Sequence, residues 1–194
     1  MLGSHNSCTY LPCRHWWMYL INWTAKCQGK TLSRQFHAGA RYFDIRVKWD
    51  EKRGKWVLAH GLIEYKGSVY EILDTLNNLA AFYGETVYVR FLLEYNKRPD
   101  NEATKILKLK RFVDEMREAA PHLTYHLIET KWDEKVIKEY SKSLTITHRY
   151  SSVLGWKRFL WIPYWYAKLH NGKALADNAD IVENPDEVLM LDFV

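Results

Sequence analysis

Short apolar runs alternate with amphipathic segments along the whole of this 194-residue chain. Six runs are rich in Val, Ile, Tyr and Phe and are short, which favours strands over helices. These predicted strands cover residues 41–47, 55–60, 86–95, 123–129, 143–149 and 187–194. Met1 and Leu2 would be the remnant of a further strand, which brings the count to seven.

Amphipathic segments with helix-capping residues lie between several of these runs, and we expect helices over 31–40, 68–84 and 101–120. Thr31 can cap the first helix. Ser68 can cap the second, because Glu71 stands at the spacing of a capping box and Gly84 can end the helix. Pro121 follows the third. Strands separated by helices of this length predict parallel pairing through helical crossovers.

This order of elements predicts an α/β fold, a compact and irregular or incomplete TIM-type (β/α) barrel. A complete barrel of this type usually needs more than 194 residues, so several outer helices would be short or absent. A doubly wound parallel sheet is the alternative. Because no internal repeat or Pro/Gly-rich linker interrupts the sequence, we expect one domain over residues 1–194.

The composition, 47% hydrophobic and 26% charged, is that of a globular protein. The sequence has no 18-residue apolar run and no basic segment followed by an apolar one at its start. We therefore expect a cytoplasmic protein and leave a virus-encoded or secreted origin open.

The net charge of +5 does not by itself indicate a nucleic-acid partner. Lys and Arg are scattered and largely balanced by acids, as in "VDEMREAA" and "KWDEKVIKEY". Such charges are typical of a solvated surface, so we expect no nucleic acid partner.

The three cysteines, Cys8, Cys13 and Cys27, cannot all pair with one another. Their crowding near one end does not suggest a disulfide framework, so we expect reduced thiols. A zinc site from Cys8, Cys13 and His5 or His15 lacks the paired C-x-x-C spacing that would support it.

Candidate chemistry lies where predicted strands end, because active sites of parallel α/β folds form at the carboxyl ends of the strands. Asp44 and Arg46 are two residues apart and share one face of their strand. An acid and a base on a buried face are costly unless they pair with each other or with a ligand. An internal ion pair and a functional site are both open.

Two further strands carry polar residues in apolar surroundings. His60 ends the strand 55–60, and Gly61 permits a sharp turn after it. Arg90 and Glu94 could share a face of the strand 86–95. By itself, a histidine at the end of a strand is more often structural than catalytic.

Asp192 is the one polar residue in the last apolar run. A buried carboxylate needs a cationic or hydrogen-bonding partner, which His5 could supply across the sheet. The alternative is an edge strand with Asp192 in solvent.

Two histidines, an arginine and carboxylates suit cleavage of a phosphodiester without a metal. One imidazole would remove a proton from an attacking hydroxyl, and the other would protonate the leaving oxygen. A guanidinium would neutralise the charge that grows on the phosphoryl group.

Three linked motifs, "GSHNSCTY", "WTAKCQGKTLSRQFHAGARYFDIRV" and "LAHG", also resemble the catalytic X region of phosphatidylinositol-specific phospholipases C. The resemblance is to the bacterial-type branch in particular, and "VLMLDFV" is similar to the last barrel strand of that family. It implies attack of an inositol 2-hydroxyl on phosphorus, which releases diacylglycerol and leaves a cyclic phosphate.

Carried over to matching positions, the resemblance implies His5 as general base, with Asp192 as the carboxylate that holds its tautomer. Arg46 would stabilise the phosphate beside Asp44, and His60 would be the general acid. Independently of the resemblance, Asn6, Arg90 and Glu94 are further candidates, either to bind the substrate or to support the residues that do. The residues 3–7 would form the loop that carries the base, with Gly3 giving it the turn.

Asn6 departs from the bacterial pattern, in which an Asp follows the first His and supports the acid. An amide can orient an imidazole but cannot stabilise imidazolium by charge. Calcium-dependent relatives have Asn at this position as a metal ligand, together with acids two apart on the next strand. Because Arg46 stands at the second of those positions and would repel a cation, we expect no metal and no cofactor.

The segment 158–172, "RFLWIPYWYAKLHNG", has no confident counterpart in that family. Its Tyr, Trp and Lys suit either peripheral contact with a membrane interface or packing over the barrel where helices are missing. We expect a monomer that acts on a phospholipid or a soluble phosphodiester. The alternatives are a metal-dependent glycerophosphodiester phosphodiesterase and a catalytically weakened module that binds phospholipid headgroups or phosphorylated ligands.

Overall fold

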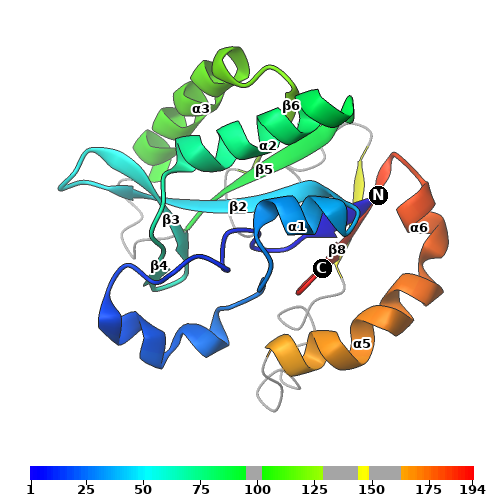
Figure 1. Ribbon diagram of the computed structural model, residues 1–194. Coiled ribbons are helices and arrows are strands. Elements are labelled where there is room, and N and C mark those ends of the chain that lie inside the picture. The colour runs from blue at the N-terminus through cyan, green and yellow to red at the C-terminus, as the bar shows by residue number, and fades with distance from the viewer. Residues whose placement is uncertain (95–101, 129–143, 149–162) are drawn as a thin grey trace.

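The computed structural model describes residues 1–94, 102–128, 144–148 and 163–194. Its strands are β1 (Leu2–Ser4), β2 (Ala40–Asp50), β3 (Lys55–His60), β4 (Ile63–Glu64), β5 (Val87–Leu93), β6 (Leu123–Ile128), β7 (Thr145–His148) and β8 (Glu187–Leu191). Its helices are α1 (Leu32–His37), α2 (Val69–Tyr83), α3 (Glu102–Ala119), α5 (Pro163–Asp177) and α6 (Ala179–Glu183), with 3-10 turns η1 (Trp16–Leu20) and η2 (Asn22–Thr24). Figure 1 shows their arrangement.

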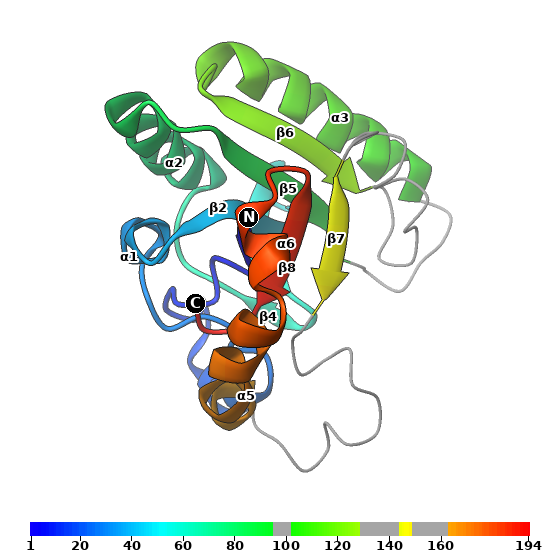
Figure 2. The same cartoon turned by 90° about the vertical axis from the view of Figure 1, so that its right-hand side faces the viewer.

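Parallel pairs connect six strands in the order β6-β5-β2-β1-β8-β7. β7 lies beside β8 (Figure 2), and no pairing joins β6 to β7 within the described residues. This part of the chain therefore forms an incomplete barrel, which confirms the predicted α/β fold class. The doubly wound alternative does not describe this structure.

One predicted connection is wrong, because β3 pairs with β2 in antiparallel orientation. The segment between the two strands is far too short for the helical crossover that parallel strands need. β2 extends to Asp50, and the chain returns through a turn in which Gly54 has a φ of 60°. The two-residue strand β4, which sequence analysis missed, then pairs antiparallel with β3.

The remaining strand predictions hold within one to three residues at each end. Four predicted strand ends and one predicted helix start lie outside the described residues. The strand ends are at 95, 129, 143 and 149, and the helix start is at 101. The local caps are confirmed: the Thr31 side chain accepts a hydrogen bond from the Arg34 backbone N–H. Ser68 and Glu71 form the capping box of α2, and Gly84 ends that helix with a φ of 65°.

The role expected of Gly3 needs correction. Gly3 lies inside β1, where it pairs with β2 and β8, and its φ is not in the left-handed region. A Cβ atom at this position would lie 2.7 Å from Val188 Cγ1 and 3.1 Å from Met190 Sδ. Gly3 therefore permits close approach to β8, and the left-handed residue after the strand is Asn6, with a φ of 48°.

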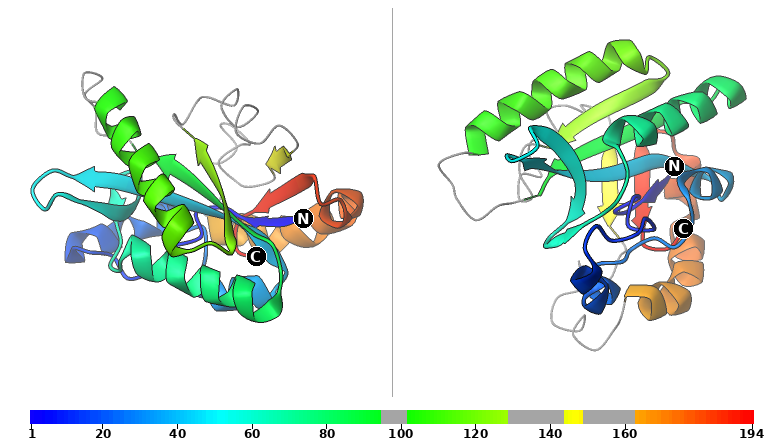
Figure 3. Two further views of the ribbon diagram at one scale, coloured as in Figure 1. Left: turned by 90° about the horizontal axis from the view of Figure 1, so that it is seen from above. Right: turned by 60° about the vertical axis from the view of Figure 1, so that its left-hand side comes forward.

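The sheet has two apolar faces, and each packs differently. Outward side chains of β2 and β5, such as Ile45 and Phe91, belong to a core that includes residues of α2 and α3. Inside the barrel, Tyr42, Val188 and Met190 form a smaller cluster. Figure 3 shows α2 and α3 (green) on one side of the sheet and α5 and α6 (orange) near β8.

The described part of the aromatic segment 158–172 belongs to α5. Tyr164 and Trp165 are about half exposed, at 48% and 52%, and the ring of Tyr164 contacts that of Phe193, which follows β8. Residues 158–162 lie outside the described part of the chain. Among the helices that the structure describes, none is both long and apolar enough to cross a membrane.

Candidate active site

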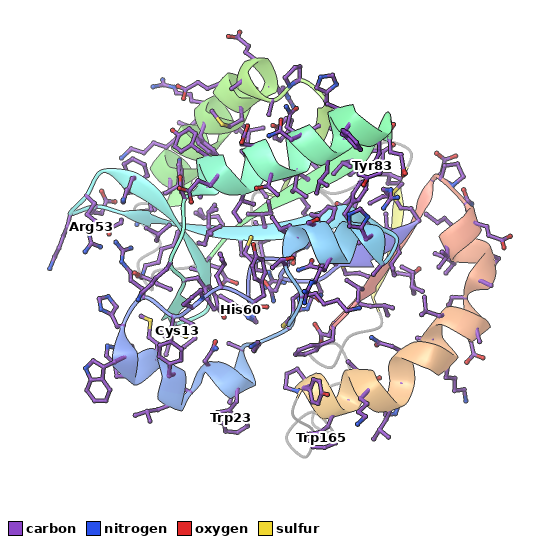
Figure 4. The ribbon with its side chains drawn as sticks, in the orientation of Figure 1. Cys13, Trp23, Arg53, His60, Tyr83 and Trp165 are labelled. Atoms are coloured by element: carbon purple, nitrogen blue, oxygen red, sulfur yellow. The ribbon has the colours of Figure 1, made fainter. Side chains whose placement is uncertain are left out.

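Five predicted residues converge at the carboxyl ends of the strands. His5 follows β1, Asp44 and Arg46 lie on β2, His60 ends β3, and Asp192 follows β8. All are buried except His60, which is partly buried. Figure 4 labels His60, which reaches from β3 towards the chain that follows η2.

His5 and Asp192 form a hydrogen bond of 2.6 Å between Nδ1 and Oδ1. Because an ionised carboxylate can only accept, the His5 proton lies on Nδ1 and leaves the lone pair on Nε2. Burial lowers the pKa of His5, and the neighbouring Asp192 opposes that effect. The residue therefore has the form that a general base requires. Since β8 is paired on both sides, the alternative of Asp192 in solvent on an edge strand is wrong.

Three partners fix the guanidinium of Arg46. Its Nε donates to Asp44 Oδ2 at 3.1 Å, its Nη1 donates to Glu94 Oε1 at 3.1 Å, and its Nη2 lies 2.8 Å from His5 Nε2. The internal ion pair expected as one alternative is thus present, and it is also part of the cluster around His5.

Arg90 adds a second cation to this layer. It lies opposite Asp44 in the register of β2 and β5, with Nε 3.5 Å from Asp44 Oδ1. Burial by itself would raise the pKa of Asp44, but Arg46 and Arg90 hold it below its ordinary value. Within the described residues, Arg90 Nε and Nη1 are buried without a hydrogen-bond partner. The charges of Arg46 and Arg90 balance those of Asp44 and Glu94, and the N–H groups at Arg90 Nε and Nη1 could donate to an anion.

His60 is fixed in one tautomer by the main chain. Its Nδ1 lies 2.7 Å from the carbonyl oxygen of Ala25, which can only accept, so Nδ1 carries the proton. The atom that gains or loses a proton is therefore Nε2. Burial and the charge of Arg46 lower the pKa of His60 to about 4. The turn after it is confirmed, because Gly61 has a φ of 60°.

Asn6 lies between the two histidines. Its backbone N–H donates to Asp44 Oδ2 at 3.1 Å, which anchors the left-handed turn. Its side-chain Nδ2 lies 3.2 Å from His5 Nε2 and 3.2 Å from His60 Nε2. The amide oxygen Oδ1 is buried and has no hydrogen-bond partner within the described residues. Asn6 thus couples the two imidazoles directly.

Sequence analysis missed the residues that hold the loop after β1. Gln28 Nε2 donates to the carbonyl oxygens of His5 and Leu191, at 3.1 and 3.2 Å. Thr9 Oγ1 accepts from the backbone N–H groups of Cys27 and Gln28. No local pattern marks these side chains, because their partners are backbone groups far away in the sequence.

The zinc alternative with Cys8 and Cys13 is not supported. Both side chains are buried as free thiols, and neither belongs to a group of three ligands within the described residues. Cys27 is also a free, buried thiol, but it lies beside His5 and Asp192.

Neither a family model nor a curated protein matches this chain. Solved structures do. The phosphatidylinositol-specific phospholipase C from Listeria monocytogenes matches with a TM-score of 0.66 and 18% identity, over 100% of this chain and 87% of that one. A mutant of the Staphylococcus aureus enzyme matches with a TM-score of 0.66 and 14% identity, over 100% of this chain and 84% of that one. The chain therefore has the fold of the bacterial phosphatidylinositol-specific phospholipases C, as its sequence motifs predict.

Proposed function

We propose that this chain is a phospholipase C-like phosphodiesterase that cleaves a glycerophosphodiester by acid-base catalysis. The observation that carries the proposal is that His5 Nε2 lies beside the Arg46 guanidinium and that one amide joins it to His60 Nε2. His5 Nε2 lies 2.8 Å from Arg46 Nη2, and His60 Nε2 is joined to His5 through the amide of Asn6. Base, acid and anion-binding group thus meet at one edge of the sheet.

In the proposed reaction, His5 Nε2 takes the proton of a hydroxyl that neighbours the phosphodiester. That oxygen bonds to phosphorus while the bond to the leaving oxygen breaks, which gives a cyclic phosphate. Asp192 stabilises the imidazolium that forms on His5, through the 2.6 Å hydrogen bond. Arg46 neutralises the charge that grows on the phosphoryl oxygens. His60 Nε2 gives its proton to the leaving oxygen.

His60 must carry a second proton for this role, whereas its pKa of about 4 keeps it neutral at pH 7. After burial, the main cause of that low pKa is the charge of Arg46. A phosphodiester anion bound to Arg46 would offset this charge and raise the pKa of His60. Substrate binding would then charge the general acid at the moment it is needed.

The test is to incubate the protein with phosphatidylinositol and follow cyclic inositol phosphate by phosphorus NMR. We expect turnover by the native chain and its loss in His5→Ala and His60→Ala. Turnover that is indifferent to both substitutions would refute the proposal. Activity that requires an added metal and disappears in EDTA would favour the glycerophosphodiesterase alternative instead.

Asn6 favours a second candidate, a module that binds phosphorylated headgroups without cleaving them. An amide between the two imidazoles adds no negative charge to help either become imidazolium. In the same experiment, saturable binding of the headgroup without any cyclic product would identify this function.

We infer that the substrate is a phospholipid reached from a membrane surface. A cluster of exposed apolar side chains covers η1 and η2, with Trp16, Leu20 and Trp23 at 79%, 69% and 56% exposure. Figure 4 shows Trp23 and Trp165 pointing outward on the same side of the molecule. Aromatic and apolar groups of this kind suit the depth of lipid headgroups. Loss of vesicle binding in Trp16→Ala would support this, and unchanged binding would contradict it.

A further inference from the structure

We propose that His5, Cys27 and Asp192 form a binding site for a thiophilic divalent cation such as Zn²⁺, and that the bound ion switches off the general base. Each side chain offers one ligand atom, and these atoms lie within 4.8 Å of one another. All three residues are buried. The inhibitory consequence rests on the proposed function, whereas binding of the ion does not.

The chemistry of the donors fits zinc. Thiolate sulfur, imidazole nitrogen and carboxylate oxygen are the ligands that zinc takes in proteins, at about 2.3, 2.0 and 2.1 Å. Such bond lengths separate the ligand atoms by roughly 3 to 4 Å in a tetrahedral site. The existing 2.6 Å between His5 Nδ1 and Asp192 Oδ1 would widen, and Cys27 would move inward. A fourth position would remain for water.

Charge places the ion on the Asp192 side of His5. Arg46 Nη2 lies 2.8 Å from Nε2, so a cation at that nitrogen would meet a guanidinium. Nδ1 instead faces the Asp192 carboxylate. This carboxylate and the Cys27 thiolate together balance two positive charges.

The amide of Asn6 is an independent indication of a missing ligand. Asn6 is buried, and its Oδ1 has no hydrogen-bond partner within the described residues. The same amide reaches the proposed site, because its Nδ2 lies 3.5 Å from Cys27 Sγ.

Binding changes the protons in a defined way. The S–H bond of Cys27 breaks, its proton leaves to solvent, and sulfur bonds to the ion. The Nδ1 lone pair of His5 also bonds to the ion, so the ring proton moves from Nδ1 to Nε2. Arg46 Nη2 and Asn6 Nδ2, which lie 2.8 and 3.2 Å from Nε2, can then no longer donate to it and must turn away. With Nε2 protonated, His5 has no lone pair for an attacking hydroxyl, and the general base is lost.

The test of binding uses Co²⁺, because cobalt bound to thiolate gives a charge-transfer band in the near ultraviolet. We expect this band on titration of the native chain and its absence in Cys27→Ser. Cys8→Ser is the matched control, since Cys8 is also a buried free thiol but lies outside the proposed ligand group. Circular dichroism would establish that each variant is folded. No band in the native chain, or a band kept in folded Cys27→Ser, would overturn the site.

The test of inhibition adds Zn²⁺ to the phosphatidylinositol assay. The zinc concentration for half inhibition should rise about tenfold or more in Cys27→Ser, relative to the native chain and Cys8→Ser. Equal inhibition of all three would overturn the switch. A cobalt band in a chain that cleaves no phospholipid would refute the proposed function and leave the metal site standing.

Discussion

At the scale of single residues, Asn6 decides how the two histidines share protons. Its Nδ2 donates towards both Nε2 atoms, which suits two neutral imidazoles. In its proposed role as the acid, His60 would carry a proton on Nε2, which turns that atom from an acceptor into a donor. Rotation of the amide would then present Oδ1, which has no hydrogen-bond partner within the described residues, to that proton.

Asn6→Asp should therefore raise phosphodiester cleavage near pH 7. A carboxylate beside His60 favours its charged form, and a pKa rise of one unit corresponds to about a tenfold larger charged fraction. Aspartate also accepts the left-handed φ of 48° that this position requires. The pH dependence of the cleavage rate is the measurement. An unchanged alkaline limb of the pH profile in Asn6→Asp would show that residue 6 does not govern the pKa of His60.

Arg46→Lys should lower kcat by roughly 10²- to 10³-fold with a smaller effect on KM. Lysine carries one compact ammonium in place of the planar fork that contacts Asp44, Glu94 and His5 together. Steady-state kinetics with phosphatidylinositol would measure the changes in kcat and in KM separately.

The control for this substitution is Arg53→Lys, in the turn between β2 and β3. Arg53 makes an exposed 2.8 Å ion pair with Asp50. Such surface pairs contribute little, so its kinetics should match those of the native chain. Equal activity of Arg46→Lys and Arg53→Lys would show that Arg46 takes no part in the reaction.

At the scale of elements, the three-residue strand β1 positions His5. It lies between β2 and β8, so His5 enters the site from the middle of the sheet. The backbone N–H of His5 donates to the carbonyl oxygen of Leu191, and that of Ser7 to Asp44. The loop with His5 is thus tied to β2, which carries Asp44, and to β8, which Asp192 follows.

Gly3→Ala should destabilise the fold by about 1–3 kcal/mol, because the added methyl group overlaps the Val188 side chain. Urea unfolding would measure the change. Val188→Ala in the same chain should restore part of the loss, since it removes the Cγ1 atom 2.7 Å away.

Gly172→Ala is the matched control, because nothing lies within 4 Å of its added Cβ in α5. Alanine in a helix is favoured over glycine by up to about 1 kcal/mol, so this variant should be slightly more stable. If both alanine variants had the same stability, close packing of β1 on β8 would not be the reason for Gly3.

At the scale of the whole molecule, the barrel interior changes from apolar to polar along the strands. Tyr42 and Met190 fill one level, and the row Asp44, Arg90 and His126 crosses β2, β5 and β6 at the next. His126 is buried between the rings of Tyr42 and Tyr88, with centroids 5.6 and 5.5 Å away. Burial and then Arg90 lower its pKa to about 4.

This burial predicts loss of stability in acid. Between pH 6.5 and 4 the unfolded chain binds a proton at His126 that the folded chain does not, so the free energy of unfolding falls as the pH falls. The contribution of His126 is on the order of 3 kcal/mol by pH 4. His126→Phe should therefore show a shallower decline over this range in urea unfolding, while exposed His122→Gln should follow the native chain. Identical declines in all three would contradict the prediction.

Local patterns in the sequence determined the elements that depend on neighbouring residues. The capping box and Gly84 define α2, since caps act within a few positions of the chain. The apolar runs located the main strands, and polar residues at strand ends identified His5, Arg46, His60 and Asp192 as candidates. For His5 and Asp192 that step needs only the common direction of parallel strands, whereas His60 ends the antiparallel strand β3.

Only the tertiary structure decided how distant segments meet. Strand pairing decides whether β3 runs parallel or antiparallel to β2. The register of the sheet decides which residue of β5 lies opposite Asp44. The same holds for Asn6 between two imidazoles and for Cys27 beside His5 and Asp192. These contacts join segments up to 187 positions apart, as His5 and Asp192 are, and no local periodicity encodes them. The sequence by itself thus determined which groups are available for chemistry, and long-range packing decided which atoms face one another.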